Sequence, residues 1–175
     1  MGVIEVRKAT VQDASAIAVV HVRSWQVAYR GHMPDEYLDG LDVEKRVSMW
    51  RQLTQETDQI VLVAENEEGD IVGFSLLGPS RDADTDANTA EVAAIYVHPE
   101  KWKQGIGRAL LSESLDQVRA RKFDQLTLWV LEGNQRARSF YESFGFIQDG
   151  AVKDEDHWKT FAVREVRYRL NASVL

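Results

Sequence analysis

The sequence predicts a single mixed α/β domain that spans residues 1–175. A chain of 175 residues suits one domain of ordinary size and leaves little room for two independent cores. Hydrophobic residues make up 44% and charged residues 28%, a balance that supports a sizeable core and argues against a disordered chain. Runs with strand periodicity and runs with helical periodicity also follow one another along the chain, without a repeat or linker.

The first third of the chain is predicted to be mainly helical. Residues 3–7 alternate as in a strand, and Thr10 followed by Asp13 is typical of a helix start, with the helix running to about Tyr29. After a polar break at residues 31–34, a short helix is expected around residues 35–38, and Asp42 is placed to cap another helix. The apolar side of the first helix is formed by Ala14, Ile17, Ala18, His21, Val22, Trp25, Ala28 and Tyr29.

The middle of the chain is predicted to form three strands. Residues 60–65 and 70–77 are apolar runs joined by Asn66-Glu67-Glu68-Gly69, which favours a hairpin. The Asp-rich segment 79–89 is expected to be a loop, and residues 91–97 are expected to form the third strand.

The remaining elements complete the α/β pattern. A helix over residues 105–121 and a strand over residues 125–131 give, with the preceding strand, a strand–helix–strand unit. A further helix begins at Asn134 and ends by Gly145. Two last strands are expected at residues 146–148 and 161–170.

Composition excludes several classes of function. Lys and Arg total 21 against 28 Asp and Glu, a net charge of −7, so nucleic acid is not expected as a partner. The chain has no Cys, which removes disulfides, thiolate nucleophiles and Cys-containing zinc sites, and its four His lack metal-ligand spacing, so no metal is expected. With no signal core and no apolar run of membrane length, we expect a cytoplasmic protein without a membrane partner.

The most informative stretch is residues 98–111, where the end of a strand meets a helix through two glycines. Glycine lets backbone approach a ligand closely, and free N–H groups at a helix start favour an anion such as a pyrophosphate, with Lys103 and Arg108 adding charge. The alternative is an ordinary strand-to-helix turn. A dinucleotide fingerprint is excluded because Leu110 stands at its third glycine, and a P-loop motif is absent.

A second stretch, residues 134–146, places several polar groups on one helix side. Asn134, Ala137, Arg138 and Tyr141 are three, four and seven residues apart. Asn134 can bond an amide and Tyr141 can give a proton. The alternative makes Asn134 only a cap and Tyr141 a half-buried aromatic residue.

Together the two stretches resemble the GNAT superfamily of acyl-CoA N-acyltransferases. The family turn reads Arg/Gln-x-x-Gly-x-Gly/Ala and its later helix reads Asn-x-x-Ala-x-x-Phe-Tyr-x-x-x-Gly-Phe; the match covers residues 91–146 well. The helix motif is complete, whereas Trp102 stands where the turn usually has Arg or Gln. Trp102 therefore changes the side-chain contact that Arg or Gln would make at this position. It affects binding by the backbone N–H groups of the turn much less, since these groups do not depend on residue type.

The resemblance implies a predominantly antiparallel sheet with a parallel, splayed strand pair and flanking helices. It also implies acetyl-CoA as co-substrate, with its pyrophosphate on the turn and its pantetheine arm paired like an extra strand with residues 95–97, where an N–H near Val97 would polarise the thioester carbonyl. The expected cofactor-binding residues are Ile95, Tyr96, Val97, Lys103, Gln104, Gly105, Ile106, Gly107, Arg108, Ala109, Asn134, Ala137 and Tyr141.

Two residues are candidates for catalysis. The resemblance assigns Tyr141 as proton donor to the leaving thiolate. An amine acceptor must lose a proton before it attacks, and Glu91 is the candidate base because some members present a catalytic Glu fourteen residues before the turn glycine, here Gly105. Strand alternation puts Glu91 on one face with Ala93, Ile95 and Val97. The alternative is a surface or paired carboxylate.

The acceptor pocket is expected to involve Trp25, Tyr29, His32 and Trp129. Trp25 is equally suited to core packing, and His21 on the same helix side is expected to be a satisfied core residue rather than a base. The loop with Asp82, Asp84 and Asp86 is expected to be solvated; beside the pocket it would attract a cationic amine such as a polyamine.

These expectations combine into a GNAT N-acetyltransferase that transfers acetyl directly to a primary amine of a small molecule, without a Cys or Ser nucleophile. Two alternatives remain open: acetylation of a protein N-terminus or Lys, which needs an open groove, and a non-catalytic CoA-binding sensor. The resemblance also allows a homodimer, formed by pairing of an exposed final strand across chains.

Overall fold

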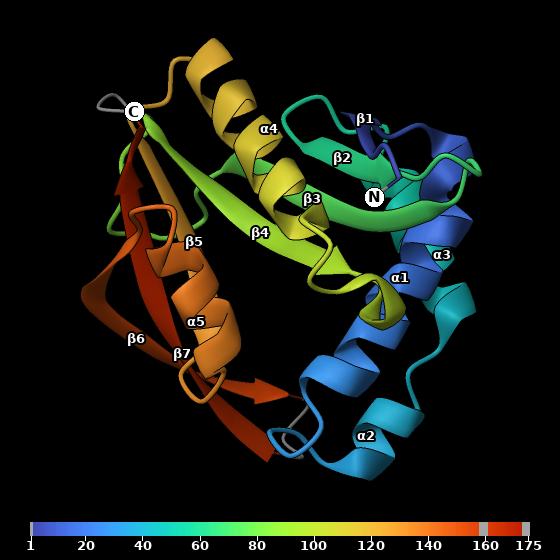
Figure 1. Cartoon of the computed structure of the whole chain (residues 1–175). Helices are drawn as coiled ribbons and strands as arrows, with labels where there is room; N and C mark the ends of the chain where they lie inside the picture. Colours follow the sequence, from blue (N-terminus) through green and yellow to red (C-terminus); the bar gives the residue numbers. More distant parts are fainter. Residues whose placement is uncertain (1, 158–160, 173–175) are drawn as a thin grey trace.

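The computed structural model describes residues 2–157 and 161–172 and folds them around one seven-stranded sheet (Figure 1). Along the sheet the strands follow the order β1-β2-β3-β4-β5-β7-β6. The elements in chain order are β1 (Glu5–Lys8), a 3₁₀ turn (Val11–Asp13), α1 (Ala14–Ala28), α2 (Asp35–Asp39), α3 (Val43–Leu53), β2 (Ile60–Glu65), β3 (Ile71–Pro79), β4 (Thr89–Val97), a 3₁₀ turn (Pro99–Lys101), α4 (Ile106–Ala120), β5 (Gln125–Leu131), α5 (Gln135–Glu142), β6 (Ile147–His157) and β7 (Phe161–Asn171).

The sheet is antiparallel except where β4 meets β5. These two strands pair in parallel from Thr89 with Gln125 to Val92 with Leu128, and no later pair is formed. Beyond Val92 they diverge, which opens the V between β4 and β5 in Figure 1. The fold class expected from the sequence, including the splayed parallel pair, is confirmed.

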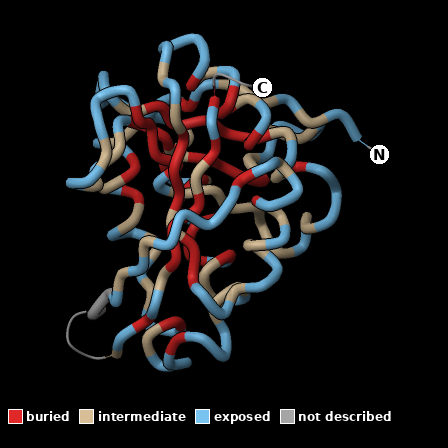
Figure 2. The backbone as a smooth tube through the Cα atoms, turned by 90° about the vertical axis from the view of Figure 1, so that its left-hand side faces the viewer, coloured by how far each residue is buried: buried red, intermediate tan, exposed pale blue. Residues whose placement is uncertain are grey.

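Helices cover both faces of the sheet and create two separate apolar layers. The apolar side of α4 packs through Leu110, Leu111 and Val118 against one face. α1 and α3 pack on the other face, where Ile17 and Trp50 are fully buried. Figure 2 shows the buried residues as a band through the middle of the chain, with exposed residues on the outer turns. The β4 arm of the V is thereby held by helices on both faces, whereas the β5 arm is held by its pairing with β7.

A β-bulge in β4 corrects the face on which Glu91 was expected. Leu76 opposes Ala94 but Leu77 opposes Val92, so Ala93 is the extra residue of the bulge. Alternation is interrupted there, because a bulge shifts the side-chain pattern by one residue. Glu91 therefore shares the α1 face with Ala94 and lies opposite to Ile95, contrary to the alternation argument.

The last two strands also differ from expectation. β6 extends over Ile147–His157 instead of residues 146–148, with an irregularity between Gln148 and Val152. β7 lies between β5 and β6, so it is not an exposed edge. The expectation that the final strand pairs across chains is wrong for this reason, since both of its sides are already hydrogen-bonded within the chain.

The Asp-rich connection between β3 and β4 is largely exposed, as expected, and is also anchored to β7. The guanidinium of Arg167 on β7 is buried and donates hydrogen bonds of 2.7 to 3.1 Å to Asp82 and Asp84, and its Nε bonds Asp149 at 2.7 Å. These charge-assisted bonds tie the loop across the end of β5. Two of the acidic side chains of this exposed loop are therefore held by an internal cation, a feature that the sequence did not indicate.

His21 is a core residue, as the sequence indicates. It is 8% exposed and its Nδ1 accepts a hydrogen bond of 3.2 Å from the indole N–H of Trp50. Burial lowers the pKa of His21 to about 3, with a smaller contribution from Arg46, so the imidazole is neutral at physiological pH.

Within the described residues, none of the helices is long and apolar enough to cross a membrane.

Removal of the Arg167 side chain is expected to destabilise the fold. In Arg167→Ala the partly buried carboxylate of Asp82 loses its cation and that of Asp149 keeps only Arg169 at 3.4 Å, and breaking a buried ion pair from one side typically costs about 3 kcal/mol. Chemical denaturation measures the free energy of unfolding. The matched control is Arg164→Ala, because Arg164 forms an exposed pair with Asp154 and exposed pairs contribute at most about 1 kcal/mol.

The same variant changes the response to acid. Hydrogen bonds from Arg167 lower the pKa of Asp84 to about 2, against about 4 in an unfolded chain. This contribution to stability is present above about pH 4 and is lost as the pH falls toward 2. The wild type should therefore lose more stability than Arg167→Ala between these pH values. Equal losses in both proteins, or equal effects of Arg167→Ala and Arg164→Ala, would contradict the anchoring role.

Candidate functional site

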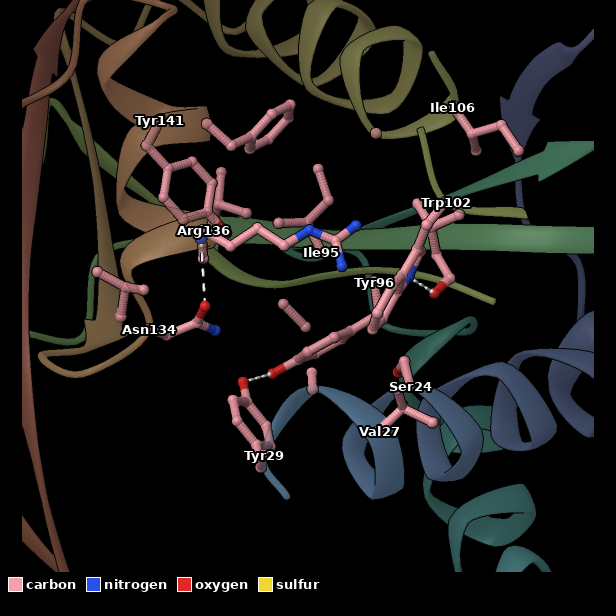
Figure 3. Close-up of a pocket in the computed structure, with 18 of the residues that line it drawn as sticks. Ser24, Val27, Tyr29, Ile95, Tyr96, Trp102, Ile106, Asn134, Arg136 and Tyr141 are labelled. Carbon is pink, nitrogen blue, oxygen red and sulfur yellow. Dashed lines mark hydrogen bonds between the residues drawn. The ribbon is translucent and has the colours of Figure 1, made fainter. Parts of the chain in front are cut away.

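One pocket of about 760 Å³ fills the V between β4 and β5 (Figure 3). Its walls come from α1, the splayed half of β4, the β4–α4 turn with the start of α4, the end of β5, and α5. Most residues predicted for the site line this pocket: Tyr29, His32, Ile95, Tyr96, Val97, Lys103, Gly105, Ile106, Gly107, Arg108, Trp129, Asn134, Ala137 and Tyr141. Four predicted residues are not among its lining: Trp25, Glu91, Gln104 and Ala109.

The β4–α4 turn has the backbone shape of an anion cradle. Gly105 precedes α4 with φ +81°, a conformation that favours glycine, and Lys103 also has a positive φ of 63°. N–H groups of the first helical turn, those of residues 106–108, have no acceptor within the helix. The Ala109 N–H instead donates to the Gly105 carbonyl at 3.0 Å, so the cradle ends one residue earlier than predicted.

The splayed edge of β4 offers strand hydrogen bonds that β5 does not use. The His98 N–H donates to Val72 on β3 at 2.8 Å. Backbone groups of successive strand residues point to opposite sides, so Val97 turns its own N–H and carbonyl into the V. The Val97 carbonyl accepts a hydrogen bond of 2.8 Å from the indole N–H of Trp102, which leaves the Val97 N–H directed at the pocket.

Cations gather at the turn end of the pocket. Lys101, Lys103, Arg108 and Arg136 all line it. The guanidinium of Arg108 lies 4.7 Å from the ring centre of Phe144, and that of Arg136 lies 3.8 Å from the ring centre of Trp102. Arg136 was not predicted from the sequence, because it occupies a variable position of the helix motif. Its position two residues after Asn134 is the feature that could have indicated a site residue.

Three tyrosines line the pocket, and one has an unpaired hydroxyl. Tyr29 and Tyr96 share a hydrogen bond of 2.7 Å between their hydroxyl oxygens. Tyr141 has no hydrogen-bond partner within the described chain. Burial, together with the nearby Tyr96, raises the pKa of Tyr141, so the phenol keeps its proton at neutral pH. Tyr141 is thus a protonated donor available to a ligand.

The other end of the pocket is built from residues predicted to face the acceptor. Tyr29, His32 and Trp129 line it. The Trp129 indole N–H donates to both carboxylate oxygens of Asp82 at 3.1 Å, so the loop anchored by Arg167 also orients this ring. Trp25 instead packs edge-on against Tyr29, with ring centres 5.0 Å apart, which agrees with the core-packing alternative.

The far side of the V is closed by an apolar cluster. Met33 and Leu38, from the segment after α1, pack with Leu131 of β5 and Val163 of β7. The His32 ring also lies against Gly133, where an added Cβ would come within 3.0 Å of it. Within the described residues, this apolar cluster and the His32–Gly133 contact therefore border the acceptor end of the pocket.

Glu91 lies outside the pocket lining and is held by Arg81. Its side chain is 4% exposed and accepts hydrogen bonds from the Arg81 backbone N–H and from the guanidinium, the shortest at 2.6 Å. This is the paired-carboxylate alternative considered from the sequence. The neighbouring Val92 and Ala93 do line the pocket.

The donors in this site fit a phosphorylated carrier with a peptide-like arm. The cradle and the cations suit a diphosphate, the splayed edge of β4 suits an amide-containing arm, and Tyr141 stands between the two ends. These features define an acyl-CoA-dependent transferase.

The chain belongs to the acetyltransferase (GNAT) family, whose model matches residues 22–146. It is 33% identical over 141 residues to YuaI, an uncharacterized N-acetyltransferase of Bacillus subtilis (strain 168), a match that covers 81% of this chain and 79% of the relative. The match to the spermidine N(1)-acetyltransferase of Thermoplasma acidophilum is 27% identical and covers 87% and 91% of the two chains.

Solved structures agree with this assignment. The crystal structure of PaiA N-acetyltransferase from Thermoplasma acidophilum in complex with coenzyme A superposes with a TM-score of 0.71 at 25% identity and covers 96% of this chain and 99% of that one. The protein is therefore an acetyl-CoA-dependent N-acetyltransferase of the GNAT family.

Proposed function

We propose that this enzyme transfers acetyl directly from acetyl-CoA to a primary amine of a small molecule. The observation that carries this proposal is a single pocket that joins the anion cradle at Gly105 to the unpaired hydroxyl of Tyr141 and ends at His32 and Trp129. Direct transfer needs no covalent enzyme intermediate, in keeping with a chain that contains no Cys and a pocket serine, Ser24, whose hydroxyl is engaged by the His21 carbonyl.

The chain supplies binding, polarisation and a proton. Acetyl-CoA brings an acetyl group activated as a thioester. The N–H groups of residues 106–108 and the surrounding cations hold phosphate, and the Val97 N–H stabilises negative charge on the carbonyl oxygen, an effect worth roughly 3 kcal/mol for one fixed donor. Tyr141 retains its proton until a thiolate sulfur needs it, because burial raises its pKa.

The closed end of the pocket favours a small acceptor over a protein chain. An extended peptide needs an open groove, whereas Met33, Leu38, Leu131 and Val163 pack across this end of the V. Within the described lining there is no carboxylate, and Asp82 and Asp84 are engaged by Arg167. These features support a small amine and give no specific support to a polyamine.

A panel of amines tests the proposal. Thiol release from acetyl-CoA is measured with small primary amines, a polyamine, a Lys-containing peptide and a peptide with a free N-terminus. Turnover should be highest with one or more of the small amines. Preference for a peptide would favour the protein acetyltransferase, and tight CoA binding without turnover on any amine would favour the sensor.

Tyr141→Phe is expected to lower kcat by about 100-fold, in the range typical of a lost general acid, with little change in the Kd of acetyl-CoA. The substitution removes the one pocket phenol without a partner and keeps its ring packing against Phe140. Steady-state kinetics give kcat and calorimetry gives Kd. Tyr168→Phe is the matched control, since that hydroxyl bonds Arg138 and Glu142 and the residue does not line the pocket. Unchanged kcat in Tyr141→Phe would remove this residue from the mechanism.

We propose Glu91 as the base that takes a proton from the acceptor amine. Its carboxylate is engaged by Arg81 and lies outside the pocket lining, so the proton would pass through water. Glu91→Gln should lower kcat about 100-fold, the range typical of a lost general base, with little change in the Kd of acetyl-CoA. The comparison is Arg81→Met, which removes the guanidinium from the carboxylate and leaves the bond from the residue 81 backbone N–H in place. If Glu91→Gln lowers the melting temperature and leaves kcat unchanged, Glu91 serves the fold only.

A further inference from the structure

Arg136 and Trp102 form a bridge across the mouth of the V. Arg136 extends from the first turn of α5 and Trp102 from the turn before α4, so each belongs to a different arm of the splay (Figure 3). The guanidinium carbon lies 3.8 Å from the centre of the indole ring, the separation of a stacked cation–π pair. The bridge lies at the same end of the pocket as Lys103 and Arg108.

The Trp102 ring is a fixed platform for this stack. Its indole N–H donates to the Val97 carbonyl at 2.8 Å, which sets the orientation of the ring relative to β4. A guanidinium held against the indole ring has less freedom than an exposed one, and its entropy loss on binding a ligand is correspondingly reduced. Trp102, the residue that differs from the family motif, thus holds Arg136 from the opposite arm of the V.

Arg136 keeps its hydrogen-bonding capacity in this position. Stacking uses the face of the guanidinium, whereas its five N–H donors lie at the edge. Within the described residues Arg136 has no carboxylate partner and no hydrogen bond to another side chain, in contrast to Arg167, which contacts three aspartates. An oriented, unneutralised cation beside an anion cradle is suited to bidentate binding of phosphate.

We propose that Arg136, held against Trp102, is a phosphate-binding residue for coenzyme A. The guanidinium that the family pattern often supplies from the position of Trp102 is supplied here from α5. This inference rests on the proposed use of coenzyme A at this pocket and adds to it the side chain that grips a phosphate of the carrier. The phosphate is either the 3′-phosphate or the diphosphate.

Calorimetry with free coenzyme A tests the assignment without relying on catalysis. Arg136→Ala should raise the Kd about tenfold at low salt, as expected for a lost charge-assisted contact, and Arg136→Lys should give a smaller increase. Trp102→Ala should weaken binding in the same direction by about threefold, because Arg136 remains but is no longer oriented. Arg119→Ala is the charge-matched control, since Arg119 pairs with Asp116 within α4 and does not line the pocket.

Dephospho-CoA, which lacks the 3′-phosphate, distinguishes the two sources of the phosphate. A tenfold penalty that disappears with dephospho-CoA assigns Arg136 to the 3′-phosphate, and a penalty that persists assigns it to the diphosphate. In either case the penalty should shrink at high salt.

Three results would overturn the assignment: a change in Kd below twofold for Arg136→Ala, a penalty equal to that of Arg119→Ala, or a penalty independent of salt, which would make the bridge a structural brace. Failure of the wild type to bind coenzyme A would instead contradict the proposed function itself.

Discussion

The site depends on one constraint, the separation of β4 and β5 after Val92 and Leu128. Beyond that point the backbone groups that β4 and β5 direct toward each other lose the partner that a continuous sheet would give them, and unpaired backbone polar groups are costly unless water or a ligand satisfies them. The bulge at Ala93 coincides with the separation, and Trp102 satisfies the Val97 carbonyl from outside the sheet. Hydrogen bonding between β4 and β5 is therefore incomplete at the pocket.

Keeping the two arms apart requires packing that does not pass through the pocket. α4 holds the β4 arm through Leu110 and Leu111, which are fully buried against the sheet. The β5 arm is held by β7, paired along its whole length, and Arg167 fastens the β3–β4 loop to it. A rigid frame of this kind orients polar groups in advance, so that little reorganisation is needed when a ligand binds.

Much of this arrangement follows from local pattern, and the exceptions have physical causes. The helical period of residues 105–121 and the Asn134 cap predict α4 and α5 closely, and the two motifs identify the pocket. The bulge at Ala93 leaves no mark in a run of small apolar residues, so the face of Glu91 was misassigned.

Long-range pairing accounts for the other differences. β6 continues through polar residues because β7 pairs with it, which alternation along a single strand does not reveal. The anchor formed by Arg167 joins residues more than eighty positions apart, a separation at which sequence spacing carries no information. Likewise, Arg136 and Trp102 come from two segments that lie close together only in the folded V, so their contact cannot be predicted from spacing.

The irregular course of β6 has a consequence for the protein in concentrated solution. β6 is an outer strand of the sheet, and its register is broken between Gln148 and Val152, around Gly150 with φ +91°. Lys153 and Asp154 follow directly and bear charge along this border. A bent, charged border is a poor template for a foreign strand, so this edge of the sheet carries its own protection against sheet-to-sheet aggregation.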